Sequence, residues 1–224
     1  PSKAKFPSGV TPVTGDMLDV ESMRKALAGV STLFLLNAVS AQELTEAVLT
    51  LNLAREAGVA RVVYFSVFNG DSFTNVPHFT SKHSVERTIA QLGLPATVLR
   101  PNCFMQNDAI FFKDALLGPG FYPFPIGDKG VSMVDVRDIA EIAASALLQG
   151  ERAQKSLPSE VINLVGPDAL TGTGIATIWS KLLNKAVKYM GSDTAPFEAR
   201  LAHHAPGWMA MDMRLMLDRF CSDG

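Results

Sequence analysis

The chain has 224 residues, 47% of them hydrophobic and 19% charged, which supports a sizeable buried core and excludes wholesale disorder. Lysine and arginine number 20 against 22 for aspartate and glutamate, so the chain lacks the basic surplus typical of direct nucleic-acid binding. This charge balance does not exclude a protein partner. No apolar run reaches the roughly 20 residues that span a bilayer, and the first residues do not resemble a signal peptide. Cys103 and Cys221 lack the spacing of a zinc site or a disulfide framework, so we expect no metal and a reducing, cytoplasmic location.

Strand and helix patterns alternate in the front half. Residues 10–16 (VTPVTGD) form a short strand-like run, and residues 20–28 indicate a helix stopped by Gly29. Residues 31–37 (STLFLLN) are a continuous apolar run of strand length, as expected for a strand covered on both faces.

The next helix is predicted to begin at a capping box made by Ser40 and Glu43, and to run to residue 57. The elements predicted after it are a strand over residues 59–67, a helix over 79–92 and a strand over 94–102. Strands separated by helices of this length indicate βαβ units, and therefore an α/β fold with a parallel sheet. Ligands of such sheets bind beyond the carboxyl ends of the strands, which directs attention to the loops after Val13, Leu36, Ser66 and Arg100.

The back half is less regular. A helix predicted over residues 102–117 is followed by GPGFYPFPIGDKG, and Asp135 is the expected N-cap of a further helix. A short strand (INLVG) and another helix (IATIWSKLLNKAV) come next. The last segment carries an apolar stripe at helical spacing, interpreted as core packing and made of Met209, Met213, Met216 and Phe220.

Several kinds of site find little support in the sequence. No G-x-G-x-x-G loop follows a first strand, and GTG at residues 172–174 lacks the third glycine, so we interpret it as an ordinary loop. No G-x-S-x-G elbow surrounds Ser66, and the adjacent His203 and His204 indicate a solvated loop rather than metal ligands. Cys103 follows a predicted strand, where a reactive thiol is one interpretation and a small residue packed against a ligand is the favoured one.

Four stretches of the chain together carry a family resemblance: GDMLDVESMRKALAGVSTLFLLN, NLAREAGVARVVYFSV, PHFTSKHSVERTIAQLGLPATVLRPNCFMQN and VDVRDIAEIAASAL. Their order resembles the NmrA-like family, whose members are atypical short-chain dehydrogenases/reductases. The resemblance covers about residues 1–189 and is most specific over residues 78–107. The sequence most resembles the redox-sensing members of the family, in which His-Phe-x-x-Lys occupies the place of the superfamily's Tyr-x-x-x-Lys.

The resemblance implies a Rossmann-type, doubly wound parallel sheet with a smaller α/β C-terminal lobe. Residues 1–106 would form part of an NAD(P)-binding domain, and residues 107–224 a substrate or partner lobe in which residues 131–149 pack back on the sheet. Family members open with a β-α-β unit whose G-x-x-G-x-x-G loop would precede Pro1, so this unit is expected to be missing here. PSKAK resembles the loop after its second strand, where a basic residue reads the 2′-phosphate of NADP, and we expect a parent protein that is longer at both ends.

The resemblance also implies cofactor contacts. Lys82 resembles the lysine that donates to the ribose hydroxyls, and Asp16 the residue that accepts from the adenine amino group, although a turn aspartate is an equal alternative. The other implied contacts follow strand ends: Asn37 and Ala38 on the ribose and pyrophosphate side, Ser66, Val67 and Phe68 beside the nicotinamide ribose, and Pro101, Asn102, Cys103 and Phe104 under the nicotinamide ring.

His78 and Lys82 lie four residues apart, so on a helix they share one face. In the reductases of the superfamily, a tyrosine at the position of His78 donates a proton to the substrate carbonyl, assisted by the lysine one turn on. An imidazole titrates close to neutral pH and could serve as a general acid. The favoured alternative is that His78 only borders the pocket and Lys82 holds the cofactor.

The function predicted from these features is an NAD(P)(H)-binding protein, with NADP(H) expected rather than NAD(H), that senses the nicotinamide pool and signals to a regulatory protein partner. The cofactor would bind two conformations of the protein with different affinities, and the segment GPGFYPFPIGDKG would be the part that moves between them. One alternative is an NAD(P)H-dependent oxidoreductase whose small-molecule substrate is a quinone, azo or carbonyl compound. Another is a cofactor-free scaffold. The absence of tyrosine at position 78 favours sensing.

Overall fold

Four parallel strands form the central sheet of this protein, whose computed structural model describes residues 6–153 and 155–224. The strands lie in the order β1-β2-β3-β5, and each neighbouring pair is parallel. Their bounds are Thr32–Leu35 for β1, Arg61–Phe65 for β2, Ala96–Pro101 for β3 and Glu160–Leu164 for β5. Val62 and Val63 point to opposite faces of β2 and are both fully buried, as expected for a sheet covered on both sides.

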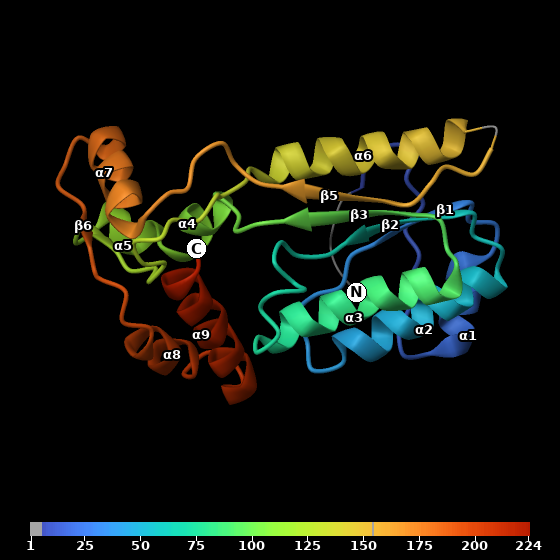
Figure 1. Cartoon of the computed structure of the whole chain (residues 1–224), viewed down its shortest axis with the longest axis horizontal. Coiled ribbons are helices and arrows are strands. Elements are labelled where there is room, and N and C mark those ends of the chain that lie inside the picture. Colours follow the sequence, from blue (N-terminus) through green and yellow to red (C-terminus); the bar gives the residue numbers. More distant parts are fainter. Residues whose placement is uncertain (1–5, 154) are drawn as a thin grey trace.

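Helices cover both faces of the sheet (Figure 1). α2 and α3 share an apolar core with the strands on one face, and α1 packs on α2, whereas α6 contacts β1, β2 and β3 from the other face. The bounds are Val20–Leu27 for α1, Glu43–Glu56 for α2, Pro77–Leu92 for α3 and Val136–Arg152 for α6. The predicted N-cap of α6 is confirmed, because the Asp135 carboxylate accepts the backbone N–H of Arg137.

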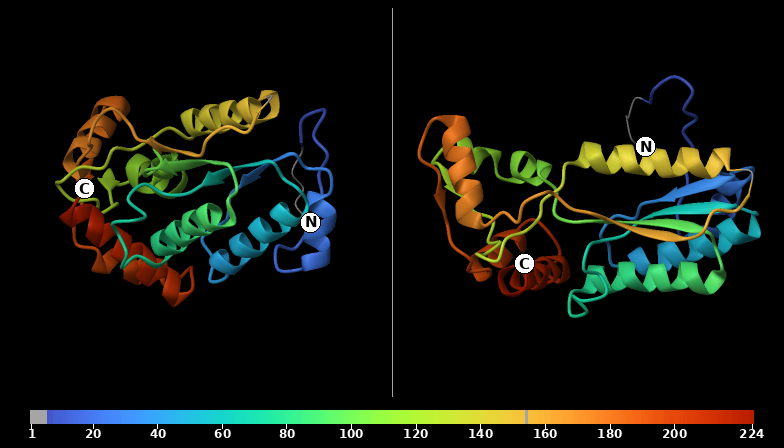
Figure 2. Two further views of the ribbon diagram at one scale, coloured as in Figure 1. Left: turned by 45° about the vertical axis from the view of Figure 1, so that its right-hand side comes forward. Right: turned by 45° about the horizontal axis from the view of Figure 1, so that its top comes forward.

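The remaining helices and strands lie beyond the carboxyl ends of the central strands and form a C-terminal lobe (Figure 1, Figure 2). It contains a two-stranded parallel sheet of β4 (Phe121–Tyr122) and β6 (Lys188–Tyr189). The helices around it are α4 Gln106–Phe111, α5 Lys113–Leu117, α7 Gly172–Leu183, α8 Ala195–Leu201 and α9 Gly207–Ser222. Its core is aromatic, and α9 reaches from this lobe to the first turn of α3. The α/β class with a parallel sheet is confirmed, and a domain boundary at residue 106 stays a prediction.

The strand predicted over residues 10–16 is not formed, so this prediction was wrong. Parallel strands exist through their hydrogen bonds to a neighbour, and no described residue pairs with this segment. Val13 is consequently 64% exposed, and β1 is an edge strand in the described part of the chain. The segment PSKAK, interpreted as a 2′-phosphate-reading loop, lies outside the described residues.

The predicted capping box at the start of α2 was also wrong. Ser40 Oγ accepts the backbone N–H of Gln42, and the N-cap residue of α2 makes no side-chain capping bond. The Glu43 side chain turns inward instead and pairs with Lys82. A stronger tertiary partner has therefore replaced the local one that the spacing suggested.

Two further elements differ from the prediction. The helix expected over residues 102–117 is split into α4 and α5, which meet at Phe112 with φ −120° and ψ 5°. The GTG segment is not a loop but the first turn of α7, where the Thr171 side chain accepts the N–H of Gly174. Gly172 is required there by close packing, because a Cβ atom would lie 2.2 Å from the Tyr189 ring.

Candidate functional site

A cavity of about 360 Å³ opens at the carboxyl ends of β1, β2 and β3, which is where a parallel sheet offers a ligand site. The loops after these strands form one side of it, and the first turns of α3 form another. The C-terminal lobe lines the rest of the wall with Asn107, Phe124 and residues of α9. The cavity is therefore built by segments far apart in the sequence.

Nine of the residues predicted from the sequence line this cavity. They are Asn37, Ser66, Val67, His78, Lys82, Pro101, Asn102, Cys103 and Phe104. Ala38 and Phe68 are neighbours of lining residues but do not line it themselves. The Phe68 backbone N–H bonds to the Pro101 carbonyl at 2.9 Å, which ties the loops after β2 and β3 together.

Asp16 lies outside the cavity wall. Its carboxylate accepts the backbone N–H of Leu18 at 2.9 Å, and its own N–H donates to Ser22 Oγ at 3.1 Å. This is the local geometry that the turn-aspartate alternative expects. A role toward an adenine amino group stays a prediction.

Lys82 is held by a buried carboxylate. Its Nζ donates to Glu43 Oε1 at 2.6 Å, and the two side chains are only 7% and 2% exposed. Burial raises the pKa of the Glu43 carboxyl, and the ammonium of Lys82 acts in the opposite direction. An ammonium has three donors and only this one is used among the described residues, so Lys82 can still donate into the cavity it lines.

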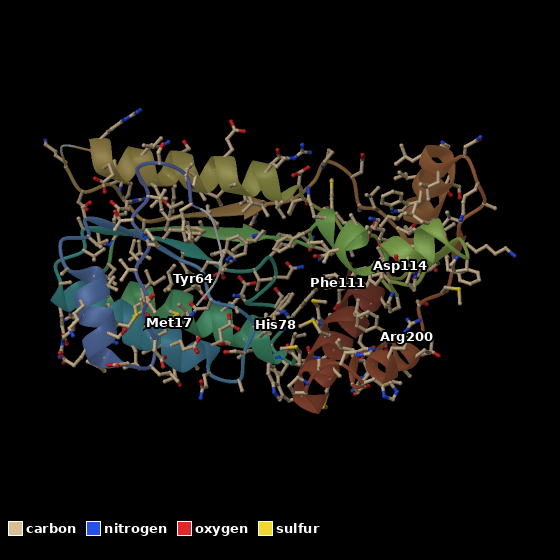
Figure 3. All side chains as sticks on the ribbon, turned by 180° about the vertical axis from the view of Figure 1, so that it is seen from behind. Met17, Tyr64, His78, Phe111, Asp114 and Arg200 are labelled. Carbon is tan, nitrogen blue, oxygen red and sulfur yellow. The ribbon has the colours of Figure 1, made fainter. Side chains whose placement is uncertain are left out.

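His78, labelled in Figure 3 on α3 beside α9, is held by a second buried carboxylate, that of Asp212 on α9. The Nδ1 atom lies 2.6 Å from Asp212 Oδ2, and the backbone N–H of His78 donates to Asp212 Oδ1 at 3.2 Å. The ring stands edge-on to the Phe79 ring, which restricts its rotation. Nε2 has no hydrogen-bond partner in the described part of the chain, and His78 lines the cavity.

Ser66 is not available as a free hydroxyl. Its Oγ donates to Glu86 on α3, and Arg100 clamps the same carboxylate with bonds of 3.0 and 2.6 Å. Arg100 also reaches Asp71 at 3.0 Å, so this network fixes the loop after β2. Ser66 is thus a structural anchor beside the cavity.

Sequence reasoning missed the residues that the C-terminal lobe contributes. Asp212 was not singled out, and the apolar stripe on the last helix was interpreted as core alone, whereas Met213, Met216 and Phe220 line the cavity. A recognisable signal was present, because a carboxylate is rarely buried within an apolar helix face unless it has a partner. The identity of that partner required the tertiary structure.

Cys103 is expected to be an unreactive thiol. It lies in the cavity wall, and burial raises the pKa of its thiol to about 12. In a Cys221→Ser variant, labelling of Cys103 by a disulfide reagent near neutral pH should be about 10³-fold slower than that of a free thiol, because the thiolate is the reactive form. Urea should restore the free-thiol rate. Complete labelling of the folded protein within minutes would contradict this expectation.

The polar groups of the cavity fit the nicotinamide-ribose half of a dinucleotide. Asn37 Oδ1 is buried without a partner among the described residues, so it can accept from a ligand hydroxyl or amide. Lys82 supplies the donors that ribose hydroxyls need. No group of three or more His, Cys, Asp or Glu side chains suited to a metal ion occurs within residues 6–153 and 155–224.

The chain belongs to the NmrA-like family, whose model matches residues 2–219, and the family prediction is confirmed. It is 26% identical over 184 residues to an NAD(P)H azoreductase from Xenophilus azovorans, a match that spans 81% of this chain and 62% of the relative. It is 27% identical over 205 residues to quinone oxidoreductase 2 from Escherichia coli, spanning 90% of this chain and 69% of the relative. The chain thus spans less than two thirds of the azoreductase.

Solved structures resemble the fold over nearly the whole chain. An NADPH-dependent quinone oxidoreductase from Escherichia coli, in complex with NADPH, superposes with a TM-score of 0.80 at 25% identity over 95% of this chain and 72% of its own. A triphenylmethane reductase from Citrobacter sp. gives the same TM-score at 21% identity, over 96% of this chain and 74% of its own, which supports the fold alone. None of the described helices is long and apolar enough to cross a membrane.

Proposed function

We propose that this chain contributes the nicotinamide and substrate sites of an NAD(P)H-dependent reductase. The observation that carries the proposal is that Lys82 and His78 face one cavity, each held by its own buried carboxylate. The azo- and quinone-reducing relatives support the same reaction class. When bound, the cofactor would supply a hydride, and this chain would orient both reactants and supply the proton.

The residues assigned to the cofactor follow the cavity wall. Lys82 and Asn37, with Ala38 beside it, would bind the ribose and pyrophosphate side. Ser66, Val67 and Phe68 would flank the nicotinamide ribose, and Pro101, Asn102, Cys103 and Phe104 would lie under the ring. NADP(H) is favoured over NAD(H), since the similar Escherichia coli structure holds NADPH.

The substrate side of the cavity is apolar. Phe79, Phe124, Met213, Met216 and Phe220 surround it, and aromatic and thioether side chains of this kind suit a planar, conjugated acceptor. A quinone, azo or conjugated carbonyl compound has this shape and polarity. We therefore assign the acceptor to this class.

The test is steady-state oxidation of NADPH by the full-length natural protein with a panel of quinone, azo and carbonyl acceptors. We expect turnover, and His78→Gln should lower kcat by about 10²-fold or more, because general acid catalysis typically contributes that much. His83→Gln is the matched control, since His83 lies on the same helix but outside the cavity wall. Tight NADPH binding without turnover on any acceptor would contradict the reductase.

The sensing function predicted from the sequence is the second candidate, and one observation favours it. α9 presents Met213 and Met216 to the cavity and exposes Trp208 and Met211 to solvent, so it could report cavity occupancy to a protein partner. A sensor must bind NADPH and NADP⁺ with different conformational outcomes. Hydrogen exchange in α8 and α9 should then differ between the two cofactor forms, whereas identical exchange would contradict sensing.

A further inference from the structure

Asp212 holds the ring and the backbone of His78 at once. One carboxylate oxygen accepts the His78 backbone N–H at 3.2 Å, and the other lies 2.6 Å from Nδ1. The N-cap residue of α3, Val76, makes no side-chain capping bond, and Pro77 has no N–H, so the first free donor of the helix is that of His78. Asp212, 1% exposed, is thus a capping acceptor supplied by α9.

This arrangement determines which ring nitrogen carries the proton. A carboxylate only accepts hydrogen bonds, so Nδ1 must be the donor to Asp212. Nε2 is the remaining ring nitrogen of a residue that lines the cavity, and no described residue bonds to it. The His78 ring therefore offers its open nitrogen to a ligand in either protonation state.

Charged side chains from three helices surround His78. Asp212 faces it from α9, and Glu43 from α2 adds a second carboxylate at longer range. Lys82, one turn along α3, is the opposing cation, and it is itself paired with Glu43. Among the described residues, Asp212 has no lysine or arginine partner, so the imidazolium is the one cation that can compensate its buried charge.

We propose that Asp212 is a positioning residue that presents Nε2–H of the His78 imidazolium to the acceptor, so that His78 is the proton donor of the reaction. This rests on the proposed reductase function. The acceptor takes a hydride from the dihydronicotinamide ring and one proton from Nε2, so a quinone becomes a hydroquinone and the cofactor leaves oxidised. The neutral imidazole then regains a proton from solvent, while Nδ1–H stays bonded to Asp212.

The decisive variant is Asp212→Asn. The amide nearly preserves the volume but removes the charge, and its NH₂ group can donate to Nδ1 and so reverse the tautomer. We expect kcat to fall by about 10²-fold with a change in acceptor KM of less than about threefold, because binding is preserved and proton delivery is lost.

The matched control is Asp218→Asn. Asp218 lies on the same helix, pairs with Arg214 at 2.7 Å and does not line the cavity, so kcat of this variant should stay within about twofold of wild type. A merely structural role for Asp212 would lower stability without reversing the tautomer of His78. Thermal unfolding of both variants measures that contribution separately.

A second readout needs neither cofactor nor turnover. Nitrogen-15 NMR of the full-length protein should show the proton of neutral His78 on Nδ1 in the wild type and on Nε2 in Asp212→Asn. An Nε2–H tautomer in the wild type would overturn the proposal, as would an unchanged kcat in Asp212→Asn. Absence of turnover in the wild type would overturn the reductase function and the proton transfer together, whereas undiminished turnover in Asp212→Asn would overturn the role of Asp212 alone.

Discussion

Replacing Lys82 with alanine is expected to lower the free energy of unfolding by about 3–5 kcal/mol, the typical loss when one partner of a buried ion pair is removed. Glu43 would be left 2% exposed without the cation it pairs with, and desolvation of its charge would oppose folding. Urea unfolding followed by circular dichroism measures the change. Lys181→Ala, an exposed lysine on α7, is the control and should stay within about 0.5 kcal/mol of wild type.

The effect of Lys82→Ala should depend on pH. Burial already raises the pKa of Glu43, and removal of the ammonium that opposes this would raise it further. The native variant would then retain a proton that the unfolded chain releases above its ordinary carboxyl pKa, so stability falls as pH rises through this window. We expect a larger loss, relative to wild type, at about pH 8 than at about pH 5.5. A loss independent of pH would contradict a buried charge.

The double variant Lys82→Met with Glu43→Leu separates charge from packing. Replacing a whole buried ion pair with apolar residues of similar volume is often neutral or stabilising, so this variant should recover most of the lost stability. Binding of NADPH should not recover, because a thioether side chain in place of the ammonium would offer no donor to the ribose. Recovery of binding would remove Lys82 from the proposed cofactor site.

Leu217→Ala carries the second largest expected effect, a loss of about 2–5 kcal/mol in the free energy of unfolding. Leu217 on α9 is fully buried in the aromatic core of the C-terminal lobe, and truncation leaves a cavity that close-packed neighbours cannot fill. Thermal or urea unfolding measures this loss of stability. The same substitution at Leu182, which is 70% exposed on α7, should cost less than about 0.5 kcal/mol.

The Leu217→Ala substitution should also affect the cavity that α9 lines. α9 carries Asp212 and Met213, so a loosened helix would hold His78 less firmly and leave the substrate side of the cavity less ordered. We expect a higher KM for the acceptor in Leu217→Ala and no such change in Leu182→Ala. Equal KM values in a destabilised Leu217→Ala would show that the site is independent of this part of α9.

The amino-acid sequence by itself determined the class of fold and the lining of the sheet side of the site. Apolar runs of strand length alternate with amphipathic segments, and such patterns depend only on local periodicity. The spacing of His78 and Lys82 placed both on one face of a helix, and the residues after each strand had to gather at one edge of a parallel sheet. The individual site residues came from the family resemblance, and this geometry is the reason that nine of them line one cavity.

Only the tertiary structure decided what holds these residues and what covers them. Asp212 is 134 residues from His78, and Glu43 is 39 from Lys82, separations at which no local pattern links an acid to its partner. The segment over residues 10–16 has strand-like residues but no neighbour to pair with, since a strand is a property of two segments rather than one. Glu43 shows the same principle: its spacing from Ser40 suggested a cap, and the buried ammonium of Lys82, reached only on folding, was the stronger partner.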